Sequence, residues 1–348
     1  MKRPCVVVPR ESGEEARQRL AGADLIDEEF GIVVEEAEPP GEESETDELK
    51  LFIPVTDPDA VPAEFAVTQK DVPARAPQQT PEDLLGYAPT YERLGDIVIV
   101  DEDEPARAQE VAEAVMNSDI PVRSVINRAS KVKGQTRVRD WEVLAHDPDP
   151  EDERPPTETV HREYGYEFAV DVAEVYFSPR LATERHRVIE QVKPGENALD
   201  MFAGVGPYAV PMAAAGAEVV ACDINPTAIE YLRENARRND VADRVTAHVG
   251  DVRERTDEYE HWADRLVMNL PHTAAEFADA AVEFVGESCV VHLYDIQHED
   301  GAFDRAETAL QDAAGAEYAV TVLEEHVVRS YAPHEVNICL DARLERTG

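Results

Sequence analysis

Asp200-Met201-Phe202-Ala203-Gly204-Val205-Gly206-Pro207 follows a short apolar run, and this stretch decides the fold. A second apolar run, residues 218–222, ends in Asp223, seventeen residues after Gly206. Strand, glycine turn, helix, strand and terminal acid is the layout of a nucleotide-binding βαβ unit. The glycines let the backbone approach a ligand where a Cβ would clash. We therefore expect residues from about 171 onward to bind an adenosine-type cofactor.

The rest of this region continues the same alternation. A third strand is expected to end at Asp251, further runs cover 265–268 and 288–293, and a last pair lies near 318–328 and 335–342. Strands that alternate with helices form a doubly wound parallel sheet, and two late strands in succession form a hairpin. The predicted fold class is α/β, a Rossmann-like sheet with a terminal antiparallel hairpin.

The glycine turn also limits which cofactor the chain is expected to bind. Pro207 removes a backbone N–H that a pyrophosphate needs at a helix start, whereas S-adenosylmethionine carries no phosphate. Asp223 can hold both ribose hydroxyls, Asp251 can accept from the adenine amino group, and Asp200 can face the methionine ammonium. These acids favour a class I S-adenosylmethionine-dependent methyltransferase. A dinucleotide-binding domain is the second interpretation, and acids that merely cap turns are the third.

The composition sets the broad class. The chain has 348 residues, of which 43% are hydrophobic, enough for two or three domains. It contains no apolar run of 18 residues, so we expect no membrane span, and its four scattered cysteines show no metal or disulfide spacing. We expect a cytoplasmic monomer without a metal.

The net charge is −41, from 74 acidic and 33 basic residues. The acids are spread along the chain. Because concentrated salt screens such repulsion, this spread favours adaptation to high salt over an acidic surface for a basic partner.

Composition also divides the chain into segments. We expect a small N-terminal domain over 1–60, a linker rich in Pro, Asp, Gln and Thr over 61–81, an α+β domain over 82–170 and the cofactor domain over 171–348. The two smaller α+β domains would then supply contacts to a macromolecular substrate.

One stretch departs from the acidic background. Residues 123–139 contain no acid and six basic residues, which are Arg123, Arg128, Lys131, Lys133, Arg137 and Arg139. A charge run is usually a solvated surface, but in so acidic a chain we interpret it as a contact for RNA backbone. Tyr176 and Phe177 can stack on a base or pack an interdomain core, and composition does not decide between these.

Asn269-Leu270-Pro271 follows the fourth strand of the cofactor domain, at the edge where ligands bind. Enzymes that methylate exocyclic amines typically carry Asn-Pro-Pro-aromatic here, so this motif argues against that chemistry. Methylation of cytosine C5 needs a cysteine nucleophile, but Cys222 and Cys289 lie inside apolar runs and are expected in the core.

Several motifs together resemble the archaeal and eukaryotic tRNA (guanine-37 N1)-methyltransferase family. The resemblance covers about residues 82–348 well and the first 60 residues more loosely, and an acidic insertion at 146–158 departs from it. The matching motifs are Asn127-Arg128-Ala129-Ser130-Lys131, Arg137-Val138-Arg139, Val175-Tyr176-Phe177-Ser178-Pro179-Arg180-Leu181-Ala182-Thr183-Glu184-Arg185, residues 200–207 and Asn269-Leu270-Pro271.

The resemblance implies S-adenosylmethionine as methyl donor and tRNA with guanosine at position 37 as acceptor. It implies Glu184 as the general base for the guanine N1 proton and Asn269 as the residue that orients the guanine. Arg137 is our first choice, and Arg139 our second, for the cation that stabilises negative charge on O6. The N-terminal domain would check the folded tRNA.

The same resemblance implies the contact sets. The cofactor set is Tyr176, Phe177, Arg185, Asp200, Phe202, Gly204, Gly206, Pro207, Asp223, Ile224, Asp251, Val252, Asn269 and Pro271. The RNA set is Arg123, Arg128, Lys131, Lys133 and Arg180. The alternatives are an enzyme acting on another RNA purine or on a wyosine precursor, and a non-catalytic RNA-binding protein with a vestigial cofactor fold.

Overall fold

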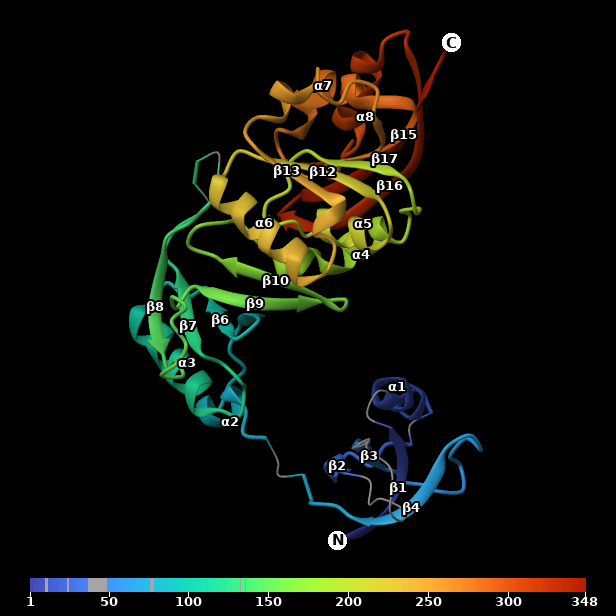
Figure 1. Cartoon of the computed structure of the whole chain (residues 1–348). Coiled ribbons are helices and arrows are strands. Elements are labelled where there is room, and N and C mark those ends of the chain that lie inside the picture. Colours follow the sequence, from blue (N-terminus) through green and yellow to red (C-terminus); the bar gives the residue numbers. More distant parts are fainter. Residues whose placement is uncertain (10–11, 24, 37–48, 76–77, 132, 135) are drawn as a thin grey trace. The chain divides into compact units, whose positions relative to one another are not determined.

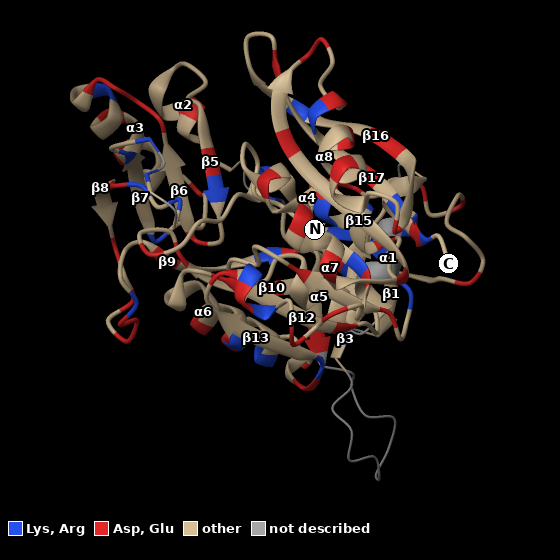
Figure 2. Cartoon of the chain, turned by 90° about the horizontal axis from the view of Figure 1, so that it is seen from above, with Lys and Arg blue, Asp and Glu red and all other residues tan. Residues whose placement is uncertain are grey.

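The computed structural model describes residues 1–9, 12–23, 25–36, 49–75, 78–131, 133–134 and 136–348. Contacts divide the chain into two compact units, Met1–Gln79 and Thr80–Gly348, which we call the N-terminal and C-terminal units (Figure 1). In the described residues, no helix is long and apolar enough to cross a membrane. Aspartate and glutamate residues occur on helices, strands and loops alike (Figure 2).

The N-terminal unit is an antiparallel sheet of order β2-β3-β1-β4 with α1 packed against it. Val6, Leu20 and Ile53 lie in its core. Its elements are β1 Lys2–Pro9, α1 Gly13–Gly22, β2 Val33–Glu36, β3 Leu49–Pro54 and β4 Ala66–Asp71.

Strand β4 lies in the interval that the sequence predicted to be a linker, so that prediction is wrong for these residues. β4 pairs along β1 from Lys2↔Asp71 to Val7↔Ala66. It is an edge strand with a mostly exposed surface, so it lacks the apolar alternation that marks a strand in a sequence.

The C-terminal unit begins with a small sheet of order β5-β6-β7-β8. All four residues of β6 are buried, as the run Ile-Val-Ile-Val predicts, and α3 covers this sheet. A two-stranded hairpin then leads to the large sheet. The elements are α2 Pro81–Leu85, β5 Tyr91–Leu94, β6 Ile97–Val100, α3 Pro105–Asn117, β7 Ser124–Arg128, β8 Trp141–His146, β9 Glu158–Glu163 and β10 Tyr166–Asp171.

The large sheet has seven strands in the order β13-β12-β11-β14-β15-β17-β16. The strands β13, β12, β11, β14 and β15 are parallel to their neighbours, and β17 is antiparallel to both β15 and β16. This arrangement confirms the doubly wound sheet with a terminal hairpin. Its elements are η2 Pro179–Leu181, α4 Ala182–Ile189, β11 Asn197–Asp200, α5 Ala209–Ala214, β12 Glu218–Asp223, α6 Pro226–Arg238, η3 Ala242–Arg244, β13 Val245–Val249, η4 Val252–Arg255, β14 Ala263–Met268, η5 Ala274–Phe277, α7 Ala278–Phe284, β15 Val285–His298, α8 Asp304–Ala314, β16 Tyr318–Ala332 and β17 Glu335–Arg346.

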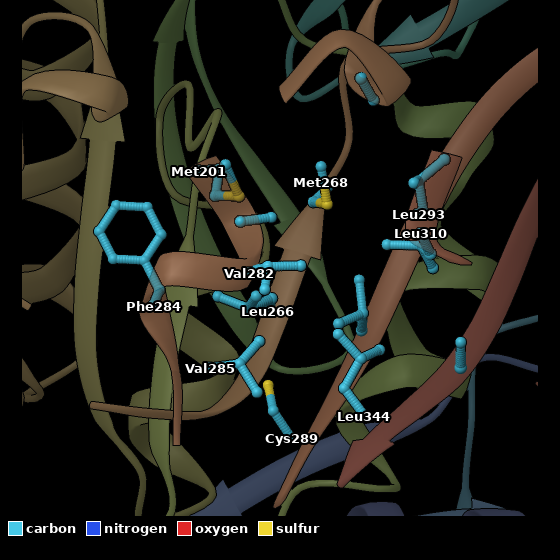
Figure 3. Close-up of a cluster of buried hydrophobic side chains, with 14 of the residues drawn as sticks. Met201, Leu266, Met268, Val282, Phe284, Val285, Cys289, Leu293, Leu310 and Leu344 are labelled. Atoms are coloured by element: carbon cyan, nitrogen blue, oxygen red, sulfur yellow. The ribbon is translucent and has the colours of Figure 1, made fainter. Parts of the chain in front are cut away.

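The large sheet is buried on both faces. Leu199 and Leu266 belong to the core beneath α7 and α8, part of which Figure 3 shows. Their strand neighbours Ala198 and Val267 belong to a second core with α5 and α6, because successive side chains of a strand point to opposite faces. With both faces covered, a ligand meets the sheet at the carboxyl ends of its strands.

The strand order places a switch point at that edge. The chain runs from β11 outward to β12 and β13, then crosses back to β14 on the other side of β11. Asp200 ends β11, and Asn269 directly follows β14, so both flank the point where open α/β sheets bind ligands.

Candidate active site

The glycine turn after β11 has the backbone that its sequence requires. Gly204 has φ 53° and Gly206 has φ 87°, a region that other L residues rarely adopt. A Cβ on Gly206 would also lie 3.1 Å from Leu232 Cγ on α6. The turn therefore packs closely against α6.

Asp223, at the end of β12, holds this turn in place. Its Oδ2 accepts the Gly204 N–H at 2.8 Å, and its Oδ1 accepts the Asn225 N–H at 2.8 Å. Burial raises the pKa of Asp223. Each oxygen keeps a second lone pair, so the carboxylate can still accept from two hydroxyls of a ligand.

Asp200 presents an unsatisfied carboxylate oxygen beside the same turn. Only 1% of the residue is exposed, and its Oδ1 accepts the Phe202 N–H at 3.3 Å. Its Oδ2 is buried without a hydrogen-bond partner among the described residues. Burial, and then the nearby charge of Asp223, raise the pKa of Asp200 to about 7. An orphaned buried acceptor is costly, which marks this oxygen as a place for a cationic or hydrogen-bonding ligand group.

The carboxylate of Asp251 is already paired with an arginine of the chain. β13 ends at Val249, two residues earlier than the sequence indicates, and Asp251 instead caps η4. Both its oxygens accept from Arg253 Nε, at 2.9 and 3.1 Å, and this pairing lowers the pKa of Asp251. A ligand amine would have to share the carboxylate with Arg253.

The remaining predicted cofactor residues around the edge differ in burial. Phe202 is half-buried and meets Phe277 edge-on, with ring centroids 4.9 Å apart. Ile224 is exposed, whereas Val252 lies in the core. Asn269 is half-buried, and within the described residues its amide makes no hydrogen bond. Pro207 and Pro271 are also half-buried.

Tyr176 connects the glycine turn with the RNA-binding region that the sequence predicts. A Cβ on Gly204 would lie 3.8 Å from the Tyr176 carbonyl oxygen. The guanidinium carbon of Arg137, which itself has φ 56°, lies 5.5 Å from the centroid of the Tyr176 ring. Tyr176 is 38% exposed, which leaves it available for stacking.

Phe177 and Arg185 have structural surroundings. Phe177 packs on Phe168 at 6.0 Å between centroids, which favours the core interpretation of this side chain. Arg185 is buried beside it and donates to Glu163 Oε1 at 2.7 Å and to the Ser178 carbonyl at 3.1 Å. This placement argues against a direct cofactor contact by Arg185.

Glu184 lies on α4 with 4% of the residue exposed. Its Oε1 accepts the Tyr294 hydroxyl at 2.7 Å and Arg187 Nη2 at 2.8 Å. Its Oε2 accepts Arg187 Nε at 2.9 Å and lies 3.2 Å from His326 Nε2. The carboxylate is therefore fixed by side chains from α4, β15 and β16.

A buried polar network stands behind Arg187. Arg187 Nη1 donates to Asp341 Oδ2 at 2.6 Å, and Asp341 Oδ1 lies 2.7 Å from His292 Nδ1. The other ring nitrogen of His292 faces Arg265 Nη1 at 2.6 Å. His292, Cys339 and Asp341 lie close enough to hold a metal ion, but a guanidinium already occupies the His292 ring. The network therefore orients Arg187.

The second feature of the site is a pocket of about 200 Å³. It is lined by residues of β5 to β8, by the segment around Tyr176 and by one residue of β16. Its wall includes Trp141, Tyr176 and five arginines, which are Arg128, Arg137, Arg139, Arg180 and Arg329. Glu92 holds two of them, because its carboxylate pairs with both Arg128 and Arg180. The Arg139 guanidinium lies 5.5 Å from the Trp141 ring centroid, and burial lowers the pKa of Arg139.

The other basic residues of 123–139 have varied environments. Arg123 is 6% exposed, forms an ion pair with Asp96 at 3.3 Å and donates to the Pro155 carbonyl at 3.1 Å. This placement argues against a phosphate contact by Arg123. Lys131 is exposed, and Lys133 is exposed while paired with Asp140.

Sequence reasoning missed several residues that complete these sites. Tyr294, His326 and Asp341 contact the Glu184–Arg187 pair from strands that follow α4 by more than 100 residues. Glu92 and Arg329 enter the arginine pocket from β5 and β16. No local motif marks any of them.

The chain is similar to several known proteins. A model of the TRM5/TYW2 methyltransferase domain matches residues 159–323, and a model of the TYW2 N-terminal domain matches residues 76–147. The chain is 35% identical to the tRNA (guanine(37)-N(1))-methyltransferase Trm5b of Pyrococcus abyssi, over 97% of this chain and 98% of that protein.

Two further relatives are informative. The chain is 32% identical to the tRNA(Phe) (4-demethylwyosine(37)-C(7)) aminocarboxypropyltransferase of Pyrococcus horikoshii, over 77% of this chain and 94% of that protein. Among solved structures, a complex of aTrm5 with tRNALeu has a TM-score of 0.66 and 31% identity, over 98% of this chain and 99% of that chain.

Proposed function

The chain belongs to the TRM5/TYW2 methyltransferase family, and we propose that it transfers a methyl group from S-adenosylmethionine to N1 of guanosine 37 in tRNA. The product is 1-methylguanosine beside the anticodon. The observation that carries this proposal is the similarity over nearly the whole chain to a tRNA (guanine(37)-N(1))-methyltransferase.

The residues at the sheet edge suit S-adenosylmethionine. When bound, the cofactor supplies a methyl group on a sulfonium, which a nucleophile can attack. Asp223 would hold the ribose hydroxyls, and the orphaned Oδ2 of Asp200 would accept from the ammonium group. Asp251 would accept from the adenine amino group. The supporting contacts would come from Tyr176, Phe202, Gly204, Gly206, Pro207, Ile224, Val252, Asn269 and Pro271.

Guanine N1 carries a proton near neutral pH, so its attack on a methyl group requires a base. Glu184 is that base in the proposal and takes the N1 proton on its carboxylate. Arg187 and Tyr294 hold the two oxygens, so the base has a defined position before the nucleotide arrives. Burial of the carboxylate also removes the water that would compete with N1.

Loss of the N1 proton builds negative charge on O6. A fixed guanidinium there stabilises that charge, as donors do in an oxyanion hole. Arg137 and Arg139 both line the pocket, and neither has an acid partner among the described residues. Asn269 would orient the guanine through its free amide, and the exposed ring of Tyr176 would stack on it.

The RNA backbone would meet Arg128, Lys131, Lys133 and Arg180, since these lie at the pocket or on the adjoining exposed loop. We leave Arg123 and Arg185 out of the contact sets because both are buried in ion pairs within the chain. In this proposal the N-terminal unit and the segment 82–170 recognise the tRNA, and the segment 171–348 holds the cofactor.

We also propose that the protein works as a cytoplasmic monomer at high salt. The support is compositional, because 74 acidic residues against 33 basic ones repel each other unless concentrated salt screens them. Light scattering in concentrated potassium chloride would measure the oligomeric state and test this proposal.

The competing function is action on a wyosine precursor, which the similarity to the P. horikoshii aminocarboxypropyltransferase favours. Mass analysis of nucleosides from treated tRNA separates the two functions. The proposal expects a guanosine that is heavier by one methyl group. A larger adduct, or a product only on tRNA that already carries a tricyclic base, would favour the competing function.

A further inference from the structure

Three arginines of the pocket have no acid partner in the described part of the chain. Arg128 and Arg180 share Glu92, but no described carboxylate forms an ion pair with Arg137, Arg139 or Arg329. Acids outnumber bases 74 to 33, and most described arginines elsewhere are paired. A cluster of unpaired cations in a concave site indicates a place for an anionic ligand.

Arg329 is the member of this cluster that sequence motifs did not indicate. It lies on β16, whereas Arg137 and Arg139 lie between β7 and β8. Its Nε is buried and makes no hydrogen bond among the described residues. The strand register shifts between Val327 and Arg329, an irregularity of the kind that re-aims a side chain.

The residue opposite Arg329 also lacks a hydrogen-bond partner. Arg329 is paired with Asn337 on β17, so the two side chains share one face of the sheet. Asn337 Oδ1 is itself buried without a hydrogen-bond partner. Arg329 Nε and Asn337 Oδ1 therefore do not bond to each other, and the Arg329 side chain lines the pocket.

The size of the pocket limits what it can bind. Its volume of about 200 Å³ is below the range of roughly 300–1,000 Å³ that holds drug-sized ligands, so it accommodates part of a nucleotide. The guanidinium carbon of Arg137 lies 5.5 Å from the centroid of the Tyr176 ring, which suits a base that stacks on this ring. Arg329 enters the lining from a different element, β16.

We propose that Arg329 binds a backbone phosphate of the nucleotide whose base enters this pocket. This assignment rests on the proposed function, because it takes an RNA nucleotide as the ligand. Arg329 then fixes the nucleotide through its phosphate while Arg137 or Arg139 faces the base. It acts on binding of the RNA and takes no part in proton transfer.

The test compares Arg329→Gln with Arg343→Gln. The control removes the same charge from an exposed position on β17 outside the pocket. We expect Arg329→Gln to weaken tRNA binding about tenfold. The slope of log Kd against log potassium chloride concentration should fall by about 0.7–0.9, as expected when one phosphate contact is lost. The turnover rate at saturating tRNA and the cofactor affinity should match those of the control.

Three results would overturn the assignment. One is a tRNA affinity and salt slope equal to those of Arg343→Gln. Another is a lower turnover rate with unchanged affinity, because that assigns Arg329 to O6. The third is a lower melting temperature with unchanged binding, because that makes Arg329 a structural residue. If the proposed function itself is wrong, the unmodified protein would bind tRNA without methylating it, which distinguishes this case from the three results above.

Discussion

Replacing Asp200 with Asn should stabilise the protein and weaken its cofactor binding at the same time. The cause is the fully buried carboxylate, whose pKa is raised from 3.8 to about 7. Between these pH values the folded protein holds a proton that the unfolded chain has lost, so stability falls as the pH rises through this window. An asparagine side chain carries no charge at any of these pH values, so the variant does not lose stability in this window.

The magnitude follows from the size of the shift. A raise of about 3 units corresponds to about 4 kcal/mol above pH 7, at 1.36 kcal/mol per unit. The Asn amide N–H would have no acceptor at the orphaned position, which costs about 1–3 kcal/mol. We therefore expect Asp200→Asn to raise the free energy of unfolding by roughly 1–3 kcal/mol at pH 8 and to lose this advantage near pH 4.

The assay is denaturant unfolding without cofactor at both pH values, followed by cofactor titration at pH 8. A charge-assisted hydrogen bond contributes about 1.5–3 kcal/mol, so the dissociation constant should rise about tenfold to a hundredfold. Asp223→Asn is the matched control, because both its oxygens accept backbone N–H groups, and it should destabilise the fold. Equal stability of Asp200→Asn and the unmodified protein at pH 8 would refute the reasoning.

Three further predictions concern Glu184, the arginine pocket and the buried network. Glu184→Gln should slow single-turnover methylation by about 10²–10⁴-fold with unchanged cofactor affinity, and an unchanged rate would exclude it as the base. Glu92→Gln should tighten tRNA binding severalfold, measured by filter binding, because it releases Arg128 and Arg180, whereas weaker binding would make Glu92 a structural support. Asp101→Asn, which frees Arg128 alone from a more exposed acid, should have a smaller effect. Asp341→Asn should lower the free energy of unfolding by about 1.5–3 kcal/mol, because it removes the buried carboxylate that pairs with both Arg187 and His292, while Arg187 keeps Glu184. Hydrogen bonds from His292 and Arg187 hold the pKa of Asp341 well below its ordinary value of 3.8. Its contribution to stability should therefore be fully present at neutral pH and decline progressively as the pH falls below about 4. Acid unfolding curves that coincide for the two proteins would contradict this.

Local spacing was enough to predict the glycine turn and the acids at the strand ends, which we assign to the cofactor. Asp200, Gly204, Gly206 and Asp223 lie within one βαβ unit, and the geometry of such a unit follows from its turn and its strand ends. The large sheet was predictable for the same reason, because alternating strands and helices leave few topologies.

Features that depend on tertiary contacts were not predictable. The basic stretch 123–139 was visible as a charge pattern, yet the pattern did not reveal that Arg123 is buried against Asp96. Arg185 and Phe177 share a motif with Glu184, but their neighbours come from β9 and β10. Arg329 had no motif at all, because it joins the pocket from β16, nearly 200 residues after Arg137 in the sequence.

The most direct test of the proposed chemistry uses two tRNA transcripts that differ only at position 37, one with guanosine and one with adenosine. Each is incubated with the purified protein and radiolabelled S-adenosylmethionine in concentrated potassium chloride. We expect label only in the guanosine transcript, as 1-methylguanosine after digestion. Label in both transcripts, or in neither, would contradict the assignment of guanine N1 as the methyl acceptor.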